Sequence, residues 1–146
     1  MKITRFEDIE AWQVARSLTN RIYQVTKTGV FSKDYGLKDQ VRRAAVSIMA
    51  NIAEGFDAGS GAEFARFLAY AQRSCSEVQS ELYVALDQRY MSNEEFIEFY
   101  ELTAKTKSKI GAFIKYLNEA RRTKHEEPCL ISLSKSKTSP SSTALA

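Results

Sequence analysis

The chain has 146 residues, enough for one domain with its own core, and a hydrophobic content of 44% that is ordinary for a globular protein. Its first residues alternate charged and apolar side chains, which fits neither a secretory signal nor a transmembrane span, so we expect a cytoplasmic protein without membrane contacts. Cys75 lies in a helical pattern and Cys129 in a polar tail, so neither a disulfide framework nor a thiolate metal site is indicated.

The net charge of +3 is confined to the end of the chain. Residues 1–120 carry 16 basic and 16 acidic side chains, whereas residues 121–146 carry 5 basic and 2 acidic ones. A neutral body produces no strong overall field. Binding of an anionic partner would therefore require local basic patches, or several copies of the chain brought together.

Four long segments follow one another, because both prolines lie beyond residue 125 and five of the six glycines cluster near the joints, at Gly29, Gly36, Gly55, Gly59 and Gly61. Apolar residues at helical spacing predict the first helix over about 6–27 and the second over about 35–54. Gly55 stands where a C-terminal cap of the second helix belongs.

The third and fourth predicted helices each begin with a capping box, in which Ser and Glu three residues apart satisfy free amides at the helix start. Ser60 and Glu63 open a helix that runs to about residue 90, and Ser92 and Glu95 open one that runs to about residue 117. We therefore predict an all-α fold, an antiparallel up-and-down four-helix bundle over residues 1–120. Residues 121–146 are predicted to be a disordered, basic and Ser-rich tail.

The sequence offers little for catalysis. Its only histidine, His125, lies in the tail, which excludes a di-iron centre of the Glu-x-x-His type and the Ser-His-Asp and Cys-His arrangements. The segment 55–61 lacks the lysine of a phosphate-binding loop. We expect no catalytic residue, no metal and no cofactor, although an enzyme based on carboxylates or on Cys75 remains an alternative.

A polar stripe accompanies the apolar face of each central helix. On the second helix it consists of Gln40, Arg43, Ser47, Asn51 and Glu54, and on the third helix of Glu63, Tyr70, Ser74, Glu77 and Glu81. In an antiparallel hairpin Arg43 would lie opposite Ser74 and Glu77. These residues form either ordinary interhelical contacts or a buried polar network sealed by another subunit.

Two other features also allow two interpretations. Trp12 and Tyr23 widen the apolar arc of the first helix, either as core residues or as part of an oligomer interface. Arg42 points away from both stripes of the second helix, near Lys38 and Met49, either as a solvated charge or as a contact for a partner.

The run YGLKDQVRRAAVSIMANIAEG over residues 35–55 resembles the signature of a bacterial four-helix-bundle family, the proteins encoded in intervening sequences of the large-subunit ribosomal RNA gene. This family is similar to the accessory variability determinants of diversity-generating retroelements. The resemblance includes FEDIEAWQVA over residues 6–15 and EFARFL over residues 63–68, and it covers about residues 5–117. Arg73 stands where relatives usually have glycine.

The resemblance implies a non-enzymatic homo-oligomer, in known relatives a pentameric ring. Members that work with retroelements bind their reverse transcriptase and RNA or DNA through basic surface, so we expect an accessory protein that binds nucleic acid, a reverse transcriptase or both. Basic residues that would recur around such a ring or on its tails are the nucleic-acid-binding candidates. They are Lys38, Arg42, Arg66, Arg73, Arg121 and Arg122. The alternative is a purely structural or protein-interaction bundle in which the polar stripes serve assembly alone.

Overall fold

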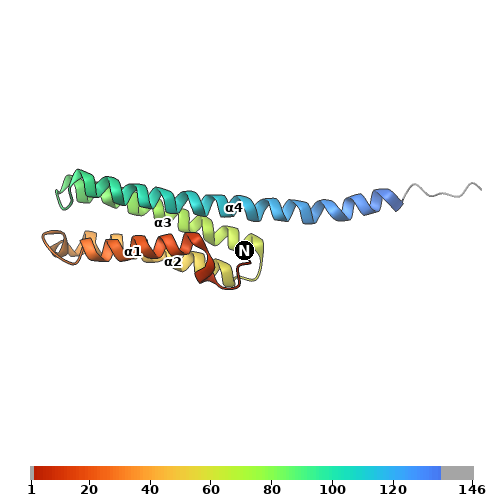
Figure 1. Ribbon diagram of the computed structural model, residues 1–146, viewed down its shortest axis with the longest axis horizontal. Helices are drawn as coiled ribbons and strands as arrows, with labels where there is room; N and C mark the ends of the chain where they lie inside the picture. The colour runs from red at the N-terminus through yellow and green to blue at the C-terminus, as the bar shows by residue number, and fades with distance from the viewer. Residues whose placement is uncertain (1, 136–146) are drawn as a thin grey trace, which may run out of the picture.

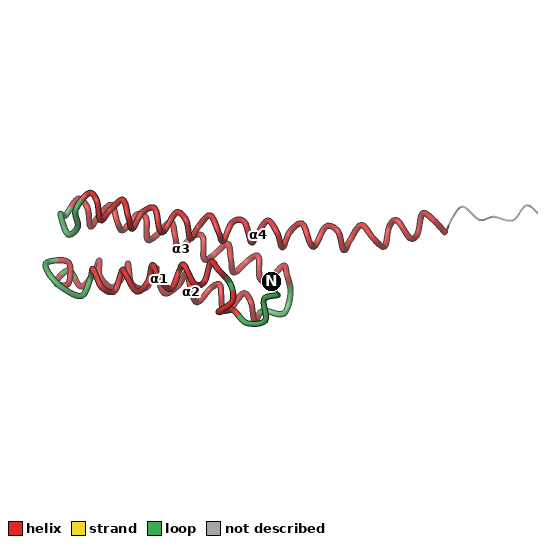
Figure 2. The backbone as a smooth tube through the Cα atoms, in the orientation of Figure 1, coloured by secondary structure: helices red, strands yellow, loops and turns green. Residues whose placement is uncertain are grey.

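The structure is a computed structural model that describes the backbone of residues 2–135 and the side chains of residues 2–124. Within that range every regular element is helical and no strand is present (Figure 2). The elements are the 3-10 turns η1 (Phe6–Asp8) and η2 (Phe31–Lys33) and the helices α1 (Glu10–Val25), α2 (Tyr35–Asp57), α3 (Gly61–Asp87) and α4 (Asn93–Lys135).

The helices pack in a closed cycle. Helix α1 contacts α2 and α4, and α3 contacts the same two helices from the other side (Figure 1). Short connections make successive helices run in opposite directions, with the α1–α2 and α3–α4 loops at the same end (Figure 1). The predicted all-α fold of four packed helices is thus confirmed.

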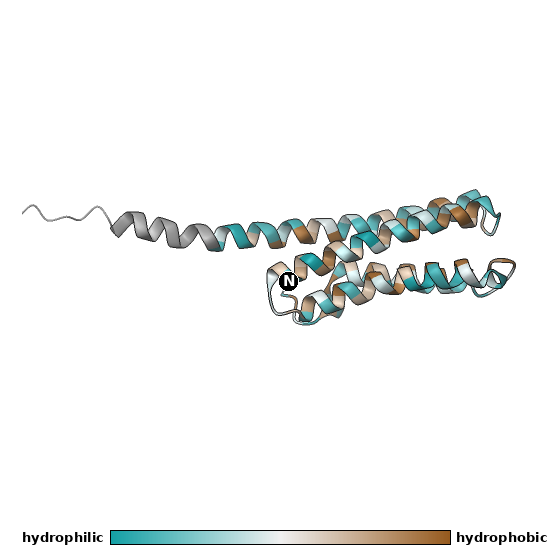
Figure 3. Cartoon of the chain, turned by 180° about the vertical axis from the view of Figure 1, so that it is seen from behind, coloured by the Kyte–Doolittle hydropathy of each residue, from teal (hydrophilic) through white to brown (hydrophobic). Residues whose placement is uncertain are grey.

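Hydrophobic and hydrophilic residues are interspersed along the coloured part of each helix (Figure 3), and a set of the hydrophobic residues from each helix is buried in the core. The largest side chains that are almost completely buried come from all four helices. They include Leu18, Ile22, Ile48, Ile52, Leu68, Leu82 and Ile110. These residues belong to the predicted apolar stripes, so the core follows the periodicity of the sequence.

The predicted capping boxes are formed to different extents. At α4 the contact is reciprocal, because Glu95 N donates to Ser92 Oγ (3.1 Å) and Ser92 N donates to Glu95 Oε2 (2.9 Å). At α3 only the serine half forms, with Glu63 N donating to Ser60 Oγ (3.2 Å). The Glu63 carboxylate pairs with Arg66 instead (2.7 Å), so its contact is one turn along the helix.

The prediction that Gly55 caps α2 is wrong. The helix continues to Asp57, and the left-handed residue of the α2–α3 connection is Gly59, at a φ of +81°. Gly55 is needed for a different reason, since a Cβ there would lie 2.8 Å from both Phe64 Cδ2 and Phe67 Cβ. The absence of a side chain allows α2 and α3 to approach closely where they meet the hairpin loop.

The fourth helix is longer than predicted. It continues past residue 117 to Lys135, beyond the body of the bundle (Figure 1). Residues 117–124 contain no glycine or proline and consist mostly of good helix formers, so no local signal ends the helix there. The structure describes residues 121–135, which the sequence analysis assigned to a disordered tail, as part of this helix, and the remainder of that prediction, 136–146, lies outside the described residues.

Candidate nucleic-acid interface

Arg42 joins α2 to the end of α1. Its Nε donates to Thr26 Oγ1 (2.8 Å), its Nη2 donates to the Tyr23 carbonyl (3.4 Å), and its guanidinium lies 4.3 Å from the centre of the Tyr23 ring. The carbonyls of a last helical turn lack partners within the helix, and a cation there also suits the helix dipole. Arg42 is consequently half-buried, and the interpretation as a solvated charge is wrong.

We expect Arg42→Met to lower the free energy of unfolding by about 1 kcal/mol, because the apolar stem remains while two hydrogen bonds and the contact with Tyr23 are lost. Arg43→Met is the matched control: Arg43 is exposed and its one salt bridge with a described side chain is to Asp39 (2.8 Å), an interaction worth about 0.5 kcal/mol or less. Urea denaturation followed by circular dichroism measures both. Equal losses in the two variants would contradict this role of Arg42.

Lys38 lies one turn before Arg42, at a basic corner of the bundle. Its Nζ is 5.0 Å from the centre of the Tyr35 ring, and 73% of Tyr35 is exposed. Lys27 and Lys33 are exposed on the loop that precedes α2. Among residues 2–124, none of these three lysines forms a salt bridge, so their charges are available to an anionic partner.

The two arginine candidates on α3 differ in their contacts. Arg66 pairs with Glu63 (2.7 Å) and lies 5.8 Å from the Phe67 ring centre, so much of its charge is balanced within the chain. Arg73 lies 5.7 Å from the Tyr70 ring centre and takes part in none of the salt bridges of the described side chains. Arg73 is therefore the stronger candidate of the two.

Arg121 and Arg122 are exposed on α4 at the other end of the bundle. The stem of Arg121 passes close to the start of α3, because a Cβ on Gly61 would lie 3.7 Å from its Cδ. The structure therefore does not gather the six basic candidates into one site. Lys38 and Arg42 share the α1–α2 corner, Arg66 and Arg73 follow α3, and Arg121 and Arg122 lie where α4 leaves the bundle.

The polar stripes of α2 and α3 meet in part. Ser47 Oγ and Ser74 Oγ share a hydrogen bond (3.0 Å), and Asn51 Nδ2 donates to the Ser47 carbonyl (2.9 Å) and to Ser47 Oγ (3.1 Å). The expected contact of Arg43 with Ser74 and Glu77 is absent from the described interactions, since the arginine pairs with Asp39 on its own helix. The other members of the predicted network, Gln40, Glu54 and Glu77, are exposed.

Glu81, a member of the polar stripe of α3, is buried, which the sequence did not indicate. Only 7% of it is exposed, and its Oε2 has no hydrogen-bond partner among the described residues. Burial raises the pKa of its carboxyl to about 7, and the neighbouring charge of Glu77 adds to the rise. Its place in the polar stripe was visible, but the sequence held no signal that this carboxylate, unlike Glu77, is buried.

A groove on the outer side of α1 and α2 contains the predicted interface residues of the first helix. Two adjoining depressions of about 510 and 520 Å³ share Tyr23, Val46 and Ala50. Trp12 is half-buried with its ring 5.2 Å from that of Phe6, whereas 42% of Tyr23 and 43% of Val46 are exposed. Trp12 thus packs largely within the chain, and Tyr23 with Val46 leaves an apolar strip at the surface.

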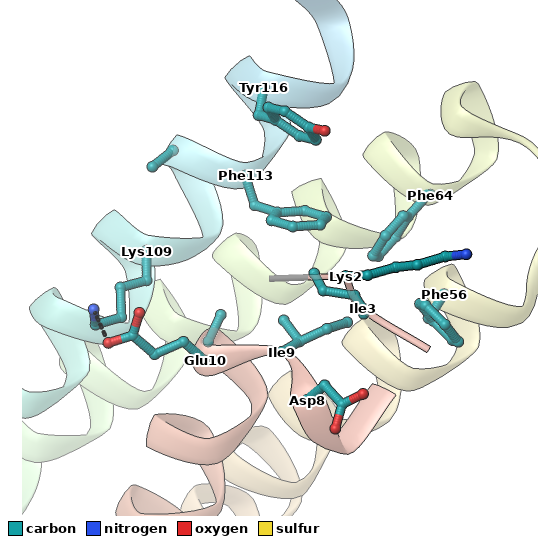
Figure 4. Close-up of a pocket in the computed structure, with 12 residues that line it drawn as sticks. Lys2, Ile3, Asp8, Ile9, Glu10, Phe56, Phe64, Lys109, Phe113 and Tyr116 are labelled. Carbon is teal, nitrogen blue, oxygen red and sulfur yellow. Dashed lines mark hydrogen bonds and ion pairs between the residues drawn. The ribbon is translucent and has the colours of Figure 1, made fainter. Parts of the chain in front are cut away.

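A larger depression of about 860 Å³ lies between the N-terminal segment, α4 and the junction of α2 and α3 (Figure 4). Its lining is mainly apolar: Ile3, Ile9, Phe56, Phe64 and Phe113. Its carboxyls are already engaged. Hydrogen bonds from Thr4 lower the pKa of Asp8, and the hydrogen bond and charge of Lys109, 2.6 Å away, lower the pKa of Glu10. A general acid needs the opposite shift.

In the part of the chain that the structure describes, no group of three His, Cys, Asp or Glu side chains could hold a metal ion. Likewise, none of the helices in this part is long and apolar enough to cross a membrane. The buried Cys75 is a poor nucleophile, because burial raises the pKa of its thiol to about 12 even with Lys107 nearby.

Comparison with known proteins identifies a family for this chain. The family model described as 23S rRNA-intervening sequence protein matches residues 7–112, which include most of the bundle. The chain belongs to this family. Of the basic candidates, Lys38, Arg42, Arg66 and Arg73 lie within the part that the intervening-sequence family model matches, and Arg121 and Arg122 lie beyond it.

The fold has a counterpart among solved structures. A protein of unknown function from the S23 ribosomal protein family of Bacteroides thetaiotaomicron is similar in structure, with a TM-score of 0.67 and 22% sequence identity. The match covers 72% of this chain and 95% of the other. At that identity the similarity concerns the fold. No curated protein matches the chain.

Proposed function

We propose that this intervening-sequence protein is a non-enzymatic, homo-oligomeric accessory protein that binds nucleic acid, alone or together with a reverse transcriptase. One observation carries the proposal: Lys38 and Arg73 lie over the rings of Tyr35 and Tyr70, two exposed tyrosines, and form no salt bridge within residues 2–124. In such a pair the cation can contact a phosphate, and the ring beside it can stack on a base.

Self-assembly would support nucleic-acid binding, because the electrostatic field of a single chain is weak. The neutral body leaves only small basic patches, and repeating them around an oligomer multiplies weak phosphate contacts. The α1–α2 groove, with exposed Tyr23 and Val46 beside Arg42 and Arg43, has the aromatic and arginine content of a protein interface. We propose a ring, as in the pentameric relatives that the sequence resembles.

The non-enzymatic assignment rests on the state of the groups that catalysis would use. The depression of about 860 Å³ offers two carboxyls whose pKa values are lowered, and the only thiol among residues 2–124 has its pKa raised to about 12. Glu81, whose pKa is raised to about 7, is 7% exposed and so has little access to a substrate. A nucleic-acid-binding role needs none of these groups.

The test combines light scattering with salt-titrated gel shifts, using fragments of 23S ribosomal RNA and single-stranded DNA. We expect an oligomer that binds both at 50 mM salt, with an affinity that falls steeply as salt increases. An oligomer that binds neither at 50 mM salt would contradict the proposal and favour the alternative, a purely structural or protein-interaction bundle.

A further inference from the structure

Tyr35 stands out among the aromatic residues of the basic corner. It is the first residue of α2, and at 73% it is the most exposed of the large hydrophobic side chains that the structure describes. An aromatic ring left in water has a favourable contact to gain from a flat partner. Its only described interaction is with Lys38, whose Nζ lies over the ring at 5.0 Å.

The backbone beneath Tyr35 is held in place from two sides. Asp34 Oδ1 accepts a hydrogen bond from Leu37 N (3.1 Å), and its Oδ2 accepts one from the Tyr90 hydroxyl (2.9 Å). The Tyr90 ring also stacks on Phe31, with centres 5.2 Å apart. These contacts tie the α1–α2 loop to the α3–α4 loop. The backbone that carries the ring is therefore already ordered, and a ligand that stacks on Tyr35 does not have to order it.

The charges around Tyr35 favour an anionic ligand. Lys27, Lys33 and Lys38 are close in sequence to the ring and unpaired among the described residues. The nearby acids are engaged: Asp34 accepts the two hydrogen bonds just described, and Asp39 pairs with Arg43 (2.8 Å).

We infer that Tyr35 and Lys38 form a stacking platform for an unpaired base, with Lys27 and Lys33 contacting the flanking phosphates, so that this corner binds single-stranded nucleic acid in preference to duplex. The inference rests on the proposed function. Bases in a duplex are stacked on one another and present no free face, and the deep, narrow major groove of an RNA helix excludes a ring of this kind. Stacking does not depend on the sugar, so RNA and DNA strands bind alike.

The test measures fluorescence anisotropy of the full chain with labelled strands of about 20 nucleotides, single-stranded or annealed to their complement, in ribose and deoxyribose forms. We expect Tyr35→Ala to weaken single-strand binding about tenfold and Tyr35→Phe to change it less than about twofold. Duplex binding should change less than about twofold in both. Tyr116→Ala is the matched control, since Tyr116 is 64% exposed but belongs to α4 near the other end of the bundle.

The possible failures are distinguishable. If Tyr35→Ala leaves single-strand binding unchanged while Lys38→Glu weakens it, the nucleic-acid function stands and the stacking platform is wrong. Equal weakening of duplex and single strand by Tyr35→Ala, or an equal effect of Tyr116→Ala, would also overturn the platform. If the parent protein binds neither form, both the platform and the proposed function are wrong.

Discussion

Gly55→Val should lower the free energy of unfolding by about 3 kcal/mol. The first added atom, Cβ, would already lie 2.8 Å from Phe64 Cδ2, 2.8 Å from Phe67 Cβ and 3.3 Å from the Phe64 carbonyl oxygen. Two of these atoms cannot swing away, because one is the first side-chain atom of Phe67 and the other belongs to the α3 backbone. The helices must separate, and overpacking of this kind costs about 1–3 kcal/mol, with the two further methyl groups adding to it.

The alanine variants decide between packing and helix propensity. Alanine favours a helix over glycine by about 1 kcal/mol, so propensity alone predicts that Gly55→Ala is stabilising. We expect it to be destabilising by about 1 kcal/mol, because the same Cβ contacts remain. Gly36→Ala is the matched control, with its nearest contact at 3.8 Å, and should be neutral or slightly stabilising. Equal urea midpoints for the two alanine variants would contradict close packing at Gly55.

Glu81→Gln should raise the free energy of unfolding by about 2 kcal/mol at pH 8 and have little effect near pH 4. Burial raises the pKa of Glu81 in the folded protein from 4.5 to about 7, with a further contribution from Glu77. At pH values between 4.5 and about 7, the Glu81 carboxyl keeps its proton in the folded chain and has released it in the unfolded chain. Each unit of difference corresponds to about 1.4 kcal/mol, and the benefit of the proton is lost as the pH rises through about 7.

The measurement is urea denaturation of the parent and Glu81→Gln proteins at several pH values from 4 to 9. Their stability difference isolates Glu81, because other carboxyls, such as Asp8 and Glu10, titrate in both. Glu77→Gln is a second variant, which should shift the midpoint of this pH dependence downward by removing a neighbouring negative charge. A stability difference between the parent and Glu81→Gln that is the same at every pH would contradict a carboxyl that is protonated by burial.

Local patterns in the sequence were sufficient to predict the four helices and most of the core residues. Apolar spacing defined the core stripes, and the Ser92 capping box appears as predicted because both of its partners lie within one turn. The interpretation of Gly55 was wrong for a reason that no local pattern carries. A glycine near a helix end suggests a cap, but here the requirement comes from Phe64 and Phe67 on another helix. Helix α4 was predicted to be shorter because the residues after Asn118 are mostly polar, although no glycine or proline interrupts them before Pro128.

The contacts of the candidate site residues were less predictable, because the partners of a long side chain depend on how the helices pack in three dimensions. Ser47 and Ser74 are short and meet where the antiparallel register brings their helices together. Arg42 instead reaches across to the end of α1, and Arg43 to Asp39 on its own helix. The burial of Glu81 depends on how closely α2 packs on α3, a distance that helical periodicity alone does not determine.

The central claim is that cations stacked on exposed rings bind nucleic acid, and the most direct test is the salt dependence of RNA binding by the double variant Lys38→Glu, Arg73→Glu. The control is the charge-matched double variant Lys105→Glu, Lys115→Glu, which changes two exposed lysines of α4 that form no salt bridge among the described residues. We predict that the double variant loses at least about tenfold in affinity, with a salt slope smaller by about 0.7 for each lost phosphate contact, while the control stays close to the parent. Equal losses in the double variant and the control would contradict the claim, because the overall charge and not these two sites would then govern binding.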